Sequence, residues 1–396
     1  MAHRASSSSI TGGHKVLILA GEVYSPNLGD GVIHETLDYL LHRHHPSLVV
    51  TPLDISGRRG YSYSDERAFT AVLSALGRKY GCAAYRWLNV LRIGVSYRTR
   101  LARLWRARLN TADALVMGGG QLLMDNHLDF PFKLYLLSRF AQAIHVPYHL
   151  LTIGVGGRWS PTAQRWIQSV VDGAETISVR DEMSGQRLMS RFGRRDVFLA
   201  SDPALWARER YGDFPSITRA TIGLGVLNLV DFNEHRSKGQ KINAEEWEGF
   251  WRQIAEGLAR EGKNVELFTN GNQLDETLAQ AVFQKRGSTS IRKAPRPRSP
   301  QELAQRVGAY QAVLTVRLHA SVLAASYNVP SMSLIWDEKV GQFYSALGGA
   351  ERAFSFSDKP PQFFVDALLR LEQGWQAEVV NTAKQRCEAA VLRIGL

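Results

Sequence analysis

Short runs of apolar, often β-branched residues alternate with amphipathic stretches of helical period along most of the 396-residue chain. Near-continuous apolar strands separated by helices are typical of parallel sheets that are covered on both faces. The pattern predicts helices within the segments 161–174, 243–261 and 318–328. It predicts strands at 15–21, 48–54, 114–120, 149–157, 176–181, 196–201, 221–228, 264–271, 312–317 and 331–337.

A polar break near 205–219 divides this alternation into two halves. We therefore expect an α/β protein with two Rossmann-like domains that face each other across a cleft. The expected order is a flexible tail (1–14), a first domain (15–205), a second domain (219–360) and C-terminal helices (361–396). The last of these helices could pack back on the first domain.

Composition narrows the class of protein. Apolar residues make up 44% of the chain and charged residues 21%, which excludes a disordered, collagen-like or coiled-coil protein. Two cysteines, Cys82 and Cys387, cannot form a disulfide framework or a multi-cysteine zinc site. No apolar run reaches the roughly 18 residues of a membrane span. The polar N-terminus has no apolar core, so we expect no secretory signal and a cytoplasmic location.

The net charge of +11 comes mainly from one segment. Between residues 67 and 110 there are ten basic residues and no acidic one, within a basic insertion that covers 58–110. The basic residues are Arg67, Arg78, Lys79, Arg86, Arg92, Arg98, Arg100, Arg103, Arg106 and Arg108.

The second half of this segment has helical spacing. Its apolar residues Leu101, Leu104, Trp105 and Leu109 are surrounded by arginines. An aromatic anchor with a cationic rim suits an anionic membrane surface. A solvated surface helix with its apolar side in the core is an equally good interpretation. Nucleic acid is not expected, because no zinc finger, RNP box or basic-leucine pattern is present. The candidate membrane residues are Arg98, Arg100, Arg103, Trp105, Arg106 and Arg108.

Ligands of open parallel sheets bind beyond the carboxyl ends of the strands, so residues that follow each predicted strand are of special interest. After the first strand, Gly29 and Gly31 allow a close backbone approach at the start of a helix. Asp30 between them either caps this helix or faces the cleft as a base or an acceptor-hydroxyl anchor.

Three successive glycines, Gly118, Gly119 and Gly120, follow the third strand. Either a ligand or another backbone segment must come close there. A tight structural turn explains them equally well. The GxGxxG fingerprint is absent from the first strand–helix turn, so NAD or FAD is not expected.

Basic residues follow three other strands. Arg180 either pairs with its neighbour Asp181 or binds a carboxylate or phosphate through two hydrogen bonds. Arg317 and His319 share a strand-to-helix transition, and a histidine beside an arginine is a candidate for proton transfer. Lys339 follows the next strand. Together these residues predict a cationic cleft for a small, multiply charged donor. No sequence pattern of a metal site is present, and none is expected.

Taken in order, these segments resemble the polysaccharide pyruvyl transferase family over roughly 27–340. The resemblance rests on NxGD, GGG, SxRD, SDPAL (201–205), RxHA and a final Trp–Lys segment. Their residues are Asn27, Gly29 and Asp30; Gly118 to Gly120; Ser178, Arg180 and Asp181; Arg317, His319 and Ala320; and Trp336 and Lys339. The long basic insertion at 58–110 departs from the simplest members of the family.

The resemblance implies a GT-B-like fold and transfer of the pyruvyl group of phosphoenolpyruvate to two hydroxyls of a sugar, with formation of a cyclic ketal. The acceptor is expected to be a bacterial-type polysaccharide or its lipid-linked precursor, on the first-domain side. The donor belongs to the second domain, and no cofactor is implied beyond phosphoenolpyruvate as co-substrate. The enzyme is then expected in the cytoplasm, peripherally at the inner face of the plasma membrane.

The resemblance also assigns roles to single residues. His319 is the expected general acid, and Asp30 the base or acceptor anchor, with Asn27 beside it. The donor is expected to contact Arg180, Arg317, Lys339, Gly118, Gly119 and Gly120.

Two other functions remain open. A nucleotide-sugar glycosyltransferase shares the architecture, but such enzymes place a carboxylate in the second domain for the ribose diol. Residues 318–330 contain none, although Asp337 and Glu338 lie close. A non-catalytic protein that binds anionic glycans or membranes would explain the basic segment. It would not explain why basic residues follow so many strands.

Overall fold

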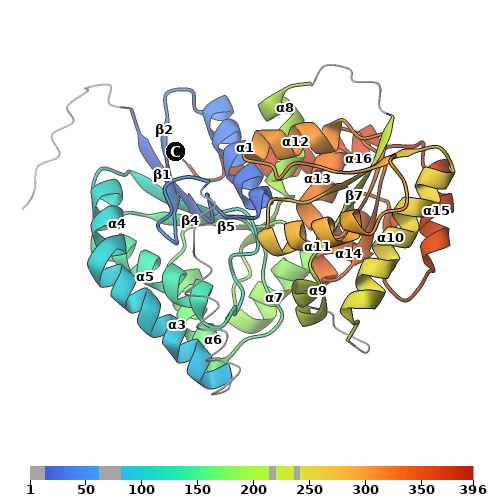
Figure 1. Ribbon diagram of the computed structural model, residues 1–396. Coiled ribbons are helices and arrows are strands. Elements are labelled where there is room, and N and C mark those ends of the chain that lie inside the picture. The colour runs from blue at the N-terminus through green and yellow to red at the C-terminus, as the bar shows by residue number, and fades with distance from the viewer. Residues whose placement is uncertain (1–13, 62–81, 214–219, 236–240, 396) are drawn as a thin grey trace, which may run out of the picture.

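The chain folds into two α/β lobes that lie side by side, with helix α1 between them (Figure 1). The computed structural model describes residues 14–61, 82–213, 220–235 and 241–395. Most of the expected N-terminal tail, and Arg67, Arg78 and Lys79 of the basic insertion, lie outside the described residues.

The first lobe is built on a six-stranded parallel sheet of order β2-β1-β3-β4-β5-β6. Its strands are β1 (Val16–Gly21), β2 (Val49–Asp54), β3 (Ala114–Gly118), β4 (Tyr148–Ile153), β5 (Ile177–Val179) and β6 (Val197–Leu199). Its helices are α1 (Leu28–His44), α3 (Cys82–Ser96), α4 (Ala102–Leu109), α5 (Asp129–Ala143), α6 (Pro161–Asp172) and α7 (Glu182–Phe192). A 3₁₀ turn at Pro203–Trp206 and helix α8 (Ala207–Tyr211) lead to the second lobe.

The second lobe repeats the design with the sheet order β12-β11-β10-β7-β8-β9, again parallel. Its strands are β7 (Thr221–Gly225), β8 (Asn264–Phe268), β9 (Ile291–Lys293), β10 (Ala312–Thr315), β11 (Ser331–Ile335) and β12 (Ala353–Ser355). Its helices are α9 (Leu229–His235), α10 (Ala244–Arg260), α11 (Gln273–Gln284), α12 (Pro300–Gly308), α13 (Leu318–Ser326) and α14 (Glu338–Ala346). Two further helices follow, α15 (Pro361–Arg370) and α16 (Ala377–Leu392).

All ten predicted strands and the three named helical segments are present, and the predicted fold of two Rossmann-like domains is confirmed. Strands β9 and β12 were not predicted. Both have only three residues and lie at sheet edges, so neither carries the long apolar run of the other strands. None of the described helices combines the length and apolar character that a membrane crossing requires.

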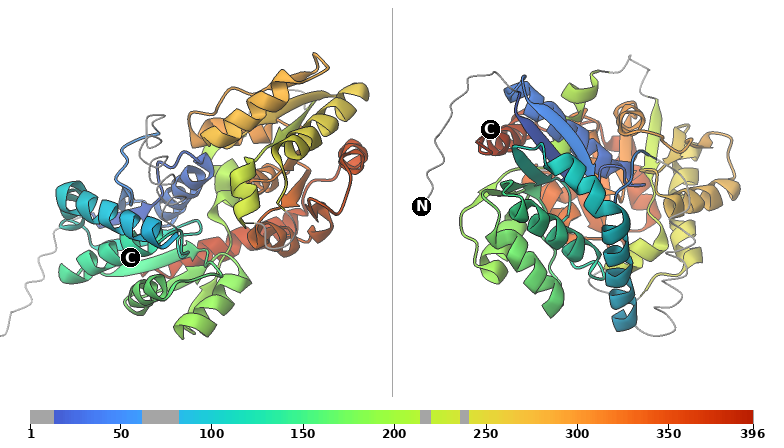
Figure 2. Two further views of the ribbon diagram at one scale, coloured as in Figure 1. Left: turned by 60° about the horizontal axis from the view of Figure 1, so that its bottom comes forward. Right: turned by 90° about the vertical axis from the view of Figure 1, so that its left-hand side faces the viewer.

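Helix α1 joins the two lobes into one molecule. Its backbone amide at Leu28 donates to the carbonyl of Asn270 in the second lobe at 2.9 Å. Its side chains belong to a single apolar core that includes α12 and α13 of the second lobe. The C-terminal helix α16 returns to contact α1, β4 and β6, with His44 Nε2 2.8 Å from Glu388 Oε1 (Figures 1 and 2). The lobes therefore share a core through α1.

The basic segment forms a nearly continuous rod of α3, a π-helical turn at Tyr97–Leu101, and α4. Leu101, Trp105 and Leu109 point into the first-lobe core, and Trp105 is fully buried. The expectation that Trp105 anchors the chain in a membrane is therefore wrong, because the ring packs inside the protein, 5.5 Å from that of Tyr97. The arginines expected beside it (Arg98, Arg100, Arg103, Arg106 and Arg108) are exposed.

Candidate active site

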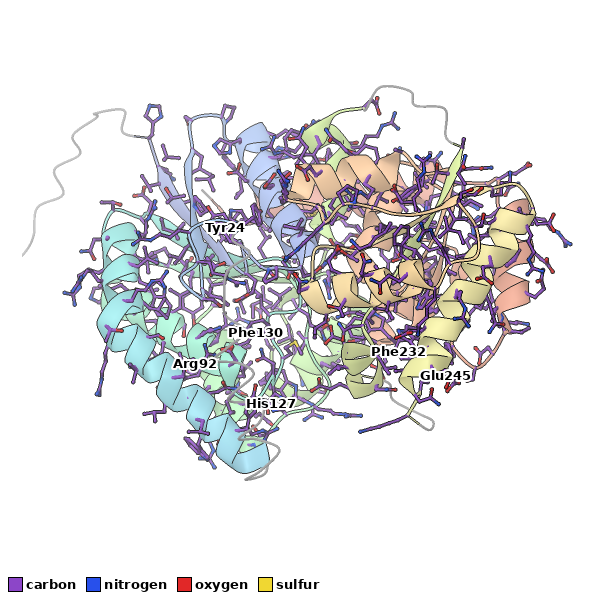
Figure 3. All side chains as sticks on the ribbon, viewed as in Figure 1. Tyr24, Arg92, His127, Phe130, Phe232 and Glu245 are labelled. Atoms are coloured by element: carbon purple, nitrogen blue, oxygen red, sulfur yellow. The ribbon has the colours of Figure 1, made fainter. Side chains whose placement is uncertain are left out.

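A pocket of about 180 Å³ opens between the lobes at the carboxyl ends of β1 and β3. This is where ligands bind in open parallel sheets. The first lobe supplies nearly all of its lining, including the labelled Phe130 of Figure 3, and the second lobe supplies Lys339. The lining residues are Gly21, Glu22, Asp30, Ile33, His34, Gly118, Gly119, Gly120, Gln121, Leu122, Met124, Phe130 and Lys339.

The three glycines Gly118, Gly119 and Gly120 line the pocket, and Gly119 also allows close packing within the first lobe. Gly119 has a φ of 72°, and a Cβ there would lie 1.9 Å from Cγ2 of Ile33, so glycine is needed for α1 to pack on the sheet. Gly120 has a φ of 77°, and its Cβ position lies 4.0 Å from Oδ1 of Asp30. The tight-turn interpretation therefore accounts for Gly119, whereas Gly120 leaves the space beside Asp30 open.

His319 lies in the first turn of α13 and crosses to the first lobe. A Cβ on Gly29 would lie 2.3 Å from the His319 Nδ1 atom, so only glycine at this position lets the imidazole rest on the first turn of α1. The histidine is 8% exposed. The sequence suggested that Gly29 lets a ligand approach the backbone. In the structure, Gly29 instead leaves space for the His319 side chain of the second lobe.

The charges around His319 come from both lobes. Burial lowers the pKa of His319, while Asp202 and Asp30 raise it and Arg180 and Lys339 lower it. Its Nε2 atom makes no hydrogen bond to any described residue and lies 3.8 Å from Oδ2 of Asp202. The imidazole is therefore neutral near pH 7 and sits where an added negative charge would favour its protonation.

Asp30 faces the pocket and does not cap α1. The residue at the cap position is Asn27, whose side chain makes no capping bond, and its Nδ2 atom donates to Asp30 Oδ2 at 3.4 Å. Burial raises the pKa of Asp30, opposed by the nearby His319. Asp30 and His319 thus form an acid–base pair within one site.

Arg180 is held by Asp202 more closely than by Asp181. Its Nη1 atom donates to Oδ2 of Asp202 at 3.3 Å, whereas its Nε atom is 3.8 Å from Asp181. Asp181 instead caps α7 by accepting from the Ser184 amide at 2.7 Å. The guanidinium lies against Gly154, where a Cβ would be 3.0 Å away. Among the described residues, the bond to Asp202 is the one hydrogen bond of this guanidinium, which leaves other donors for an anion.

Asp202 is a site residue that the sequence analysis did not single out, although it lies in the SDPAL motif. Its carboxylate stands between Arg180 and His319, and its Oδ1 atom accepts from the Ala204 amide at 3.0 Å. Its position shortly after strand β6 could have identified it from the sequence, because the other candidate residues also follow strands.

Arg317 is not placed as the expected donor ligand. Its Nε and Nη2 atoms donate to the two carboxylate oxygens of Asp275 at 2.8 and 3.0 Å, and Nη2 also donates to Asp231 at 2.9 Å. The buried carboxylate of Asp275 and the partly exposed carboxylate of Asp231 thus neutralise its charge inside the second lobe. In place of the expected free donor ligand, Arg317 is an ion-paired residue directly before α13, the helix that carries His319.

Lys339 spans the cleft from the first turn of α14. Its Nζ atom donates to Gln121 Oε1 of the first lobe at 2.9 Å and lies 3.5 Å from Asp337. Burial lowers the pKa of this lysine, and Asp337 opposes the shift. The ammonium also lies 4.7 Å from the centre of the Trp336 ring. Gln121, its partner, directly follows the three glycines and was not predicted.

His34 is a second residue that the sequence analysis missed. It lines the pocket one helical turn beyond Asp30, and burial lowers the pKa of its imidazole to about 4. The ring makes no hydrogen bond to a described residue. The i, i+4 spacing from Asp30 along α1 was the signal that could have found it.

The structure thus brings Asp30, Arg180, His319 and Lys339 together, and adds Asp202 and His34. Cations beside carboxyl and imidazole groups, which can accept or donate protons, suit the binding of a small anion and the transfer of protons to and from it. Among the described residues, no three His, Cys, Asp or Glu side chains are grouped as a metal site would need.

Several solved structures resemble this one in fold. One UDP-GlcNAc 2-epimerase, from Methanocaldococcus jannaschii, matches with a TM-score of 0.57 and 10% identity over 96% of this chain and 99% of its own. A UDP-GlcNAc 2-epimerase from Neisseria meningitidis matches at 0.53 and 12%, over 96% and 98%. A UDP-glucosyltransferase from Polygonum tinctorium matches at 0.50 and 10%, over 97% and 98%. These likenesses confirm the GT-B-like fold.

The sequence itself identifies the family. No curated protein matches the chain significantly. The family model for polysaccharide pyruvyl transferase matches residues 27–338, which include α1 with Asp30, the glycine turn, Arg180, Asp202 and His319. The resemblance drawn from the motifs is therefore confirmed, and the chain belongs to the polysaccharide pyruvyl transferase family of transferases.

Proposed function

We propose that this protein transfers the pyruvyl group of phosphoenolpyruvate to two hydroxyls of a sugar in a polysaccharide or its lipid-linked precursor. The product is a cyclic ketal. The observation that carries the proposal is that Asp30 and Lys339, which line the interdomain pocket, lie within electrostatic range of the buried His319, which Arg180 also approaches.

The donor carries a carboxylate and a phosphate, and Arg180 and Lys339 are the cations that would bind them. Only one of the five guanidinium donors of Arg180 is used in its bond to Asp202. Lys339 bonds to the neutral amide of Gln121, and its paired carboxylate is more distant. Both side chains are largely buried, where attraction to an anion is stronger than in water.

His319 is the residue that would protonate the methylene carbon of the donor. A bound donor would bring negative charge next to the imidazole and raise its pKa. Donor binding would therefore favour the protonated imidazole, which is the form that acts as the general acid. Asp202, at 3.8 Å, stabilises the imidazolium. Protonation creates a cation-like centre at C2, which a sugar hydroxyl attacks.

The remaining protons balance. Two hydroxyls each lose a proton, C2 forms two bonds to oxygen, and the bond from C2 to the phosphate oxygen breaks. One proton in total is gained by the new methyl group, and one by the departing phosphate. Asp30 would accept the proton of the first hydroxyl and His34, one turn further along α1, that of the second. Over one turnover, one of these two protons restores the protonated His319 and the other leaves with the phosphate.

A nucleotide-sugar donor is less well supported. The two carboxylates that could hold a ribose diol near α14 both have other partners. Asp337 accepts from the Lys339 amide at 3.1 Å as the helix cap, and Glu338 pairs with Arg187 at 2.7 Å. A non-catalytic role leaves the acid–base pair without a use.

Replacing His319 by asparagine should abolish ketal formation. Asparagine fits beside Gly29 but cannot deliver a proton, so phosphate release from phosphoenolpyruvate with acceptor should fall by at least about 10²-fold. The melting temperature checks that the fold survives. Near-normal turnover in the folded variant would remove His319 from the role of general acid.

Asp202→Asn should move the pH dependence of kcat/KM. Asp202 raises the pKa of His319, so its loss lowers that pKa; because the protonated imidazole is the reactive form, the alkaline limb of the profile should shift to lower pH. Asp181→Asn is the matched control, since it removes a helix cap without touching His319. An alkaline limb that stays in place in Asp202→Asn, or moves equally in both, contradicts the assignment.

His34→Asn should lower kcat by about 10²-fold and leave the KM for phosphoenolpyruvate unchanged, because the residue would act on the acceptor. His42→Asn is the control on the same helix, where the side chain is exposed and pairs only with Asp38. Steady-state kinetics with saturating acceptor measures both. A wild-type kcat in His34→Asn would exclude it as a proton acceptor.

A further inference from the structure

Three large apolar side chains lie exposed in a row along α3. Trp87, Leu91 and Val95 are 57%, 64% and 55% exposed, and their spacing of four residues places them on one face of the helix. On the other side, Asn89 and Ile93 are buried against the first lobe. Most large apolar residues of the described chain are buried, so a continuous exposed stripe marks a surface with a partner.

The stripe continues into a basic stretch of the same rod. The side chains of Arg98, Arg100, Arg103, Arg106 and Arg108 are exposed. No carboxylate among the described residues forms an ion pair with any of the five, although Arg100 donates to the carbonyl of Gly57. From Cys82 to Leu109 the rod is about 42 Å long at 1.5 Å per residue, and it runs along the outer edge of the first lobe (Figures 1 and 2).

We propose that this face of α3 and α4 docks on an anionic lipid membrane. Trp87, Leu91 and Val95 would enter the boundary between head groups and acyl chains, where an amphipathic helix buries its apolar side. Arg103 and Arg106, three residues apart on one side of α4, would meet lipid phosphates, each adding to the attraction of a negatively charged surface. Their long side chains can reach the head groups while the helix lies flat.

The charge and the area of the face argue for lipid as the occupant. A specific protein interface buries about 800 Å² on each partner, far more than three side chains can supply. Nucleic acid could bind the arginines, but its phosphate backbone offers no apolar surface on which the stripe of Trp87, Leu91 and Val95 could be buried. An anionic membrane can bind both the apolar stripe of α3 and the arginines that follow it.

The docking face is connected to the pocket. Arg92, on the same helix, donates to Oδ1 of Asp129 at 3.4 Å, and the next residue, Phe130, lines the pocket. Asn89 donates to the carbonyl of His127 at 3.5 Å. Figure 3 shows Arg92, His127 and Phe130 on the same side of the first lobe. A docked α3 would bring the pocket close to a sugar carried on a lipid, a consequence that rests on the proposed function, whereas the docking itself does not.

The experiment is co-sedimentation of the full-length protein with vesicles of phosphatidylcholine, with and without phosphatidylglycerol, at physiological ionic strength. Binding should require the anionic lipid. The triple variant Trp87→Ser, Leu91→Ser, Val95→Ser should bind at least about tenfold more weakly, since it loses the apolar contribution. The matched control is Val49→Ser, Met189→Ser, Leu392→Ser, which removes exposed apolar residues elsewhere and should bind like the wild type.

A second variant, Arg103→Gln with Arg106→Gln, separates charge from apolar contact and should also weaken binding by at least about tenfold. Equal binding to vesicles with and without phosphatidylglycerol overturns the proposal. So does an equal loss of binding in the stripe variant and its control. Tighter binding to a DNA duplex than to anionic vesicles, unaffected by the stripe variant, would assign the face to nucleic acid instead. None of these outcomes depends on pyruvyl transfer.

Discussion

The site depends on the close packing of α1 against the second lobe. The first turn of this helix carries Gly29 where any other residue would collide with His319, and its Leu28 amide bonds to the carbonyl of Asn270. The missing side chain at Gly29 lets an imidazole from one lobe lie within electrostatic range of the carboxylate of Asp30 on the other. Because α1 also belongs to the shared core, the distance between the acid and the base is set by packing across the whole molecule.

Burial then sets the chemistry of the groups that meet there. It favours the neutral forms of His319, Lys339 and Asp30, while each is partly compensated by an opposite charge. An anionic ligand that entered such a site would change the protonation of its neighbours. Under the proposed function, a donor anion bound here would raise the pKa of His319 and favour its protonated, acidic form.

The sequence was sufficient to predict the layered fold. It also singled out four residues that lie near one another in the structure, Asp30, Arg180, His319 and Lys339, because parallel sheets put the residues after their strands at one edge. It could not show that Arg317 is neutralised by Asp275 and Asp231, since the partners of an arginine depend on tertiary packing. The same holds for Trp105, where helical spacing does not tell which face of an amphipathic helix is covered. Asp202 needed the structure because its neighbours are distant in sequence.

The most direct test of the central claim is phosphate release from phosphoenolpyruvate by the wild-type protein, with a panel of glycosides and lipid-linked oligosaccharides and mass spectrometry of the products. The account predicts release that depends on the acceptor, and a product heavier by one pyruvate less one water. Consumption of a UDP- or GDP-sugar under the same conditions, with phosphoenolpyruvate left intact, would contradict it.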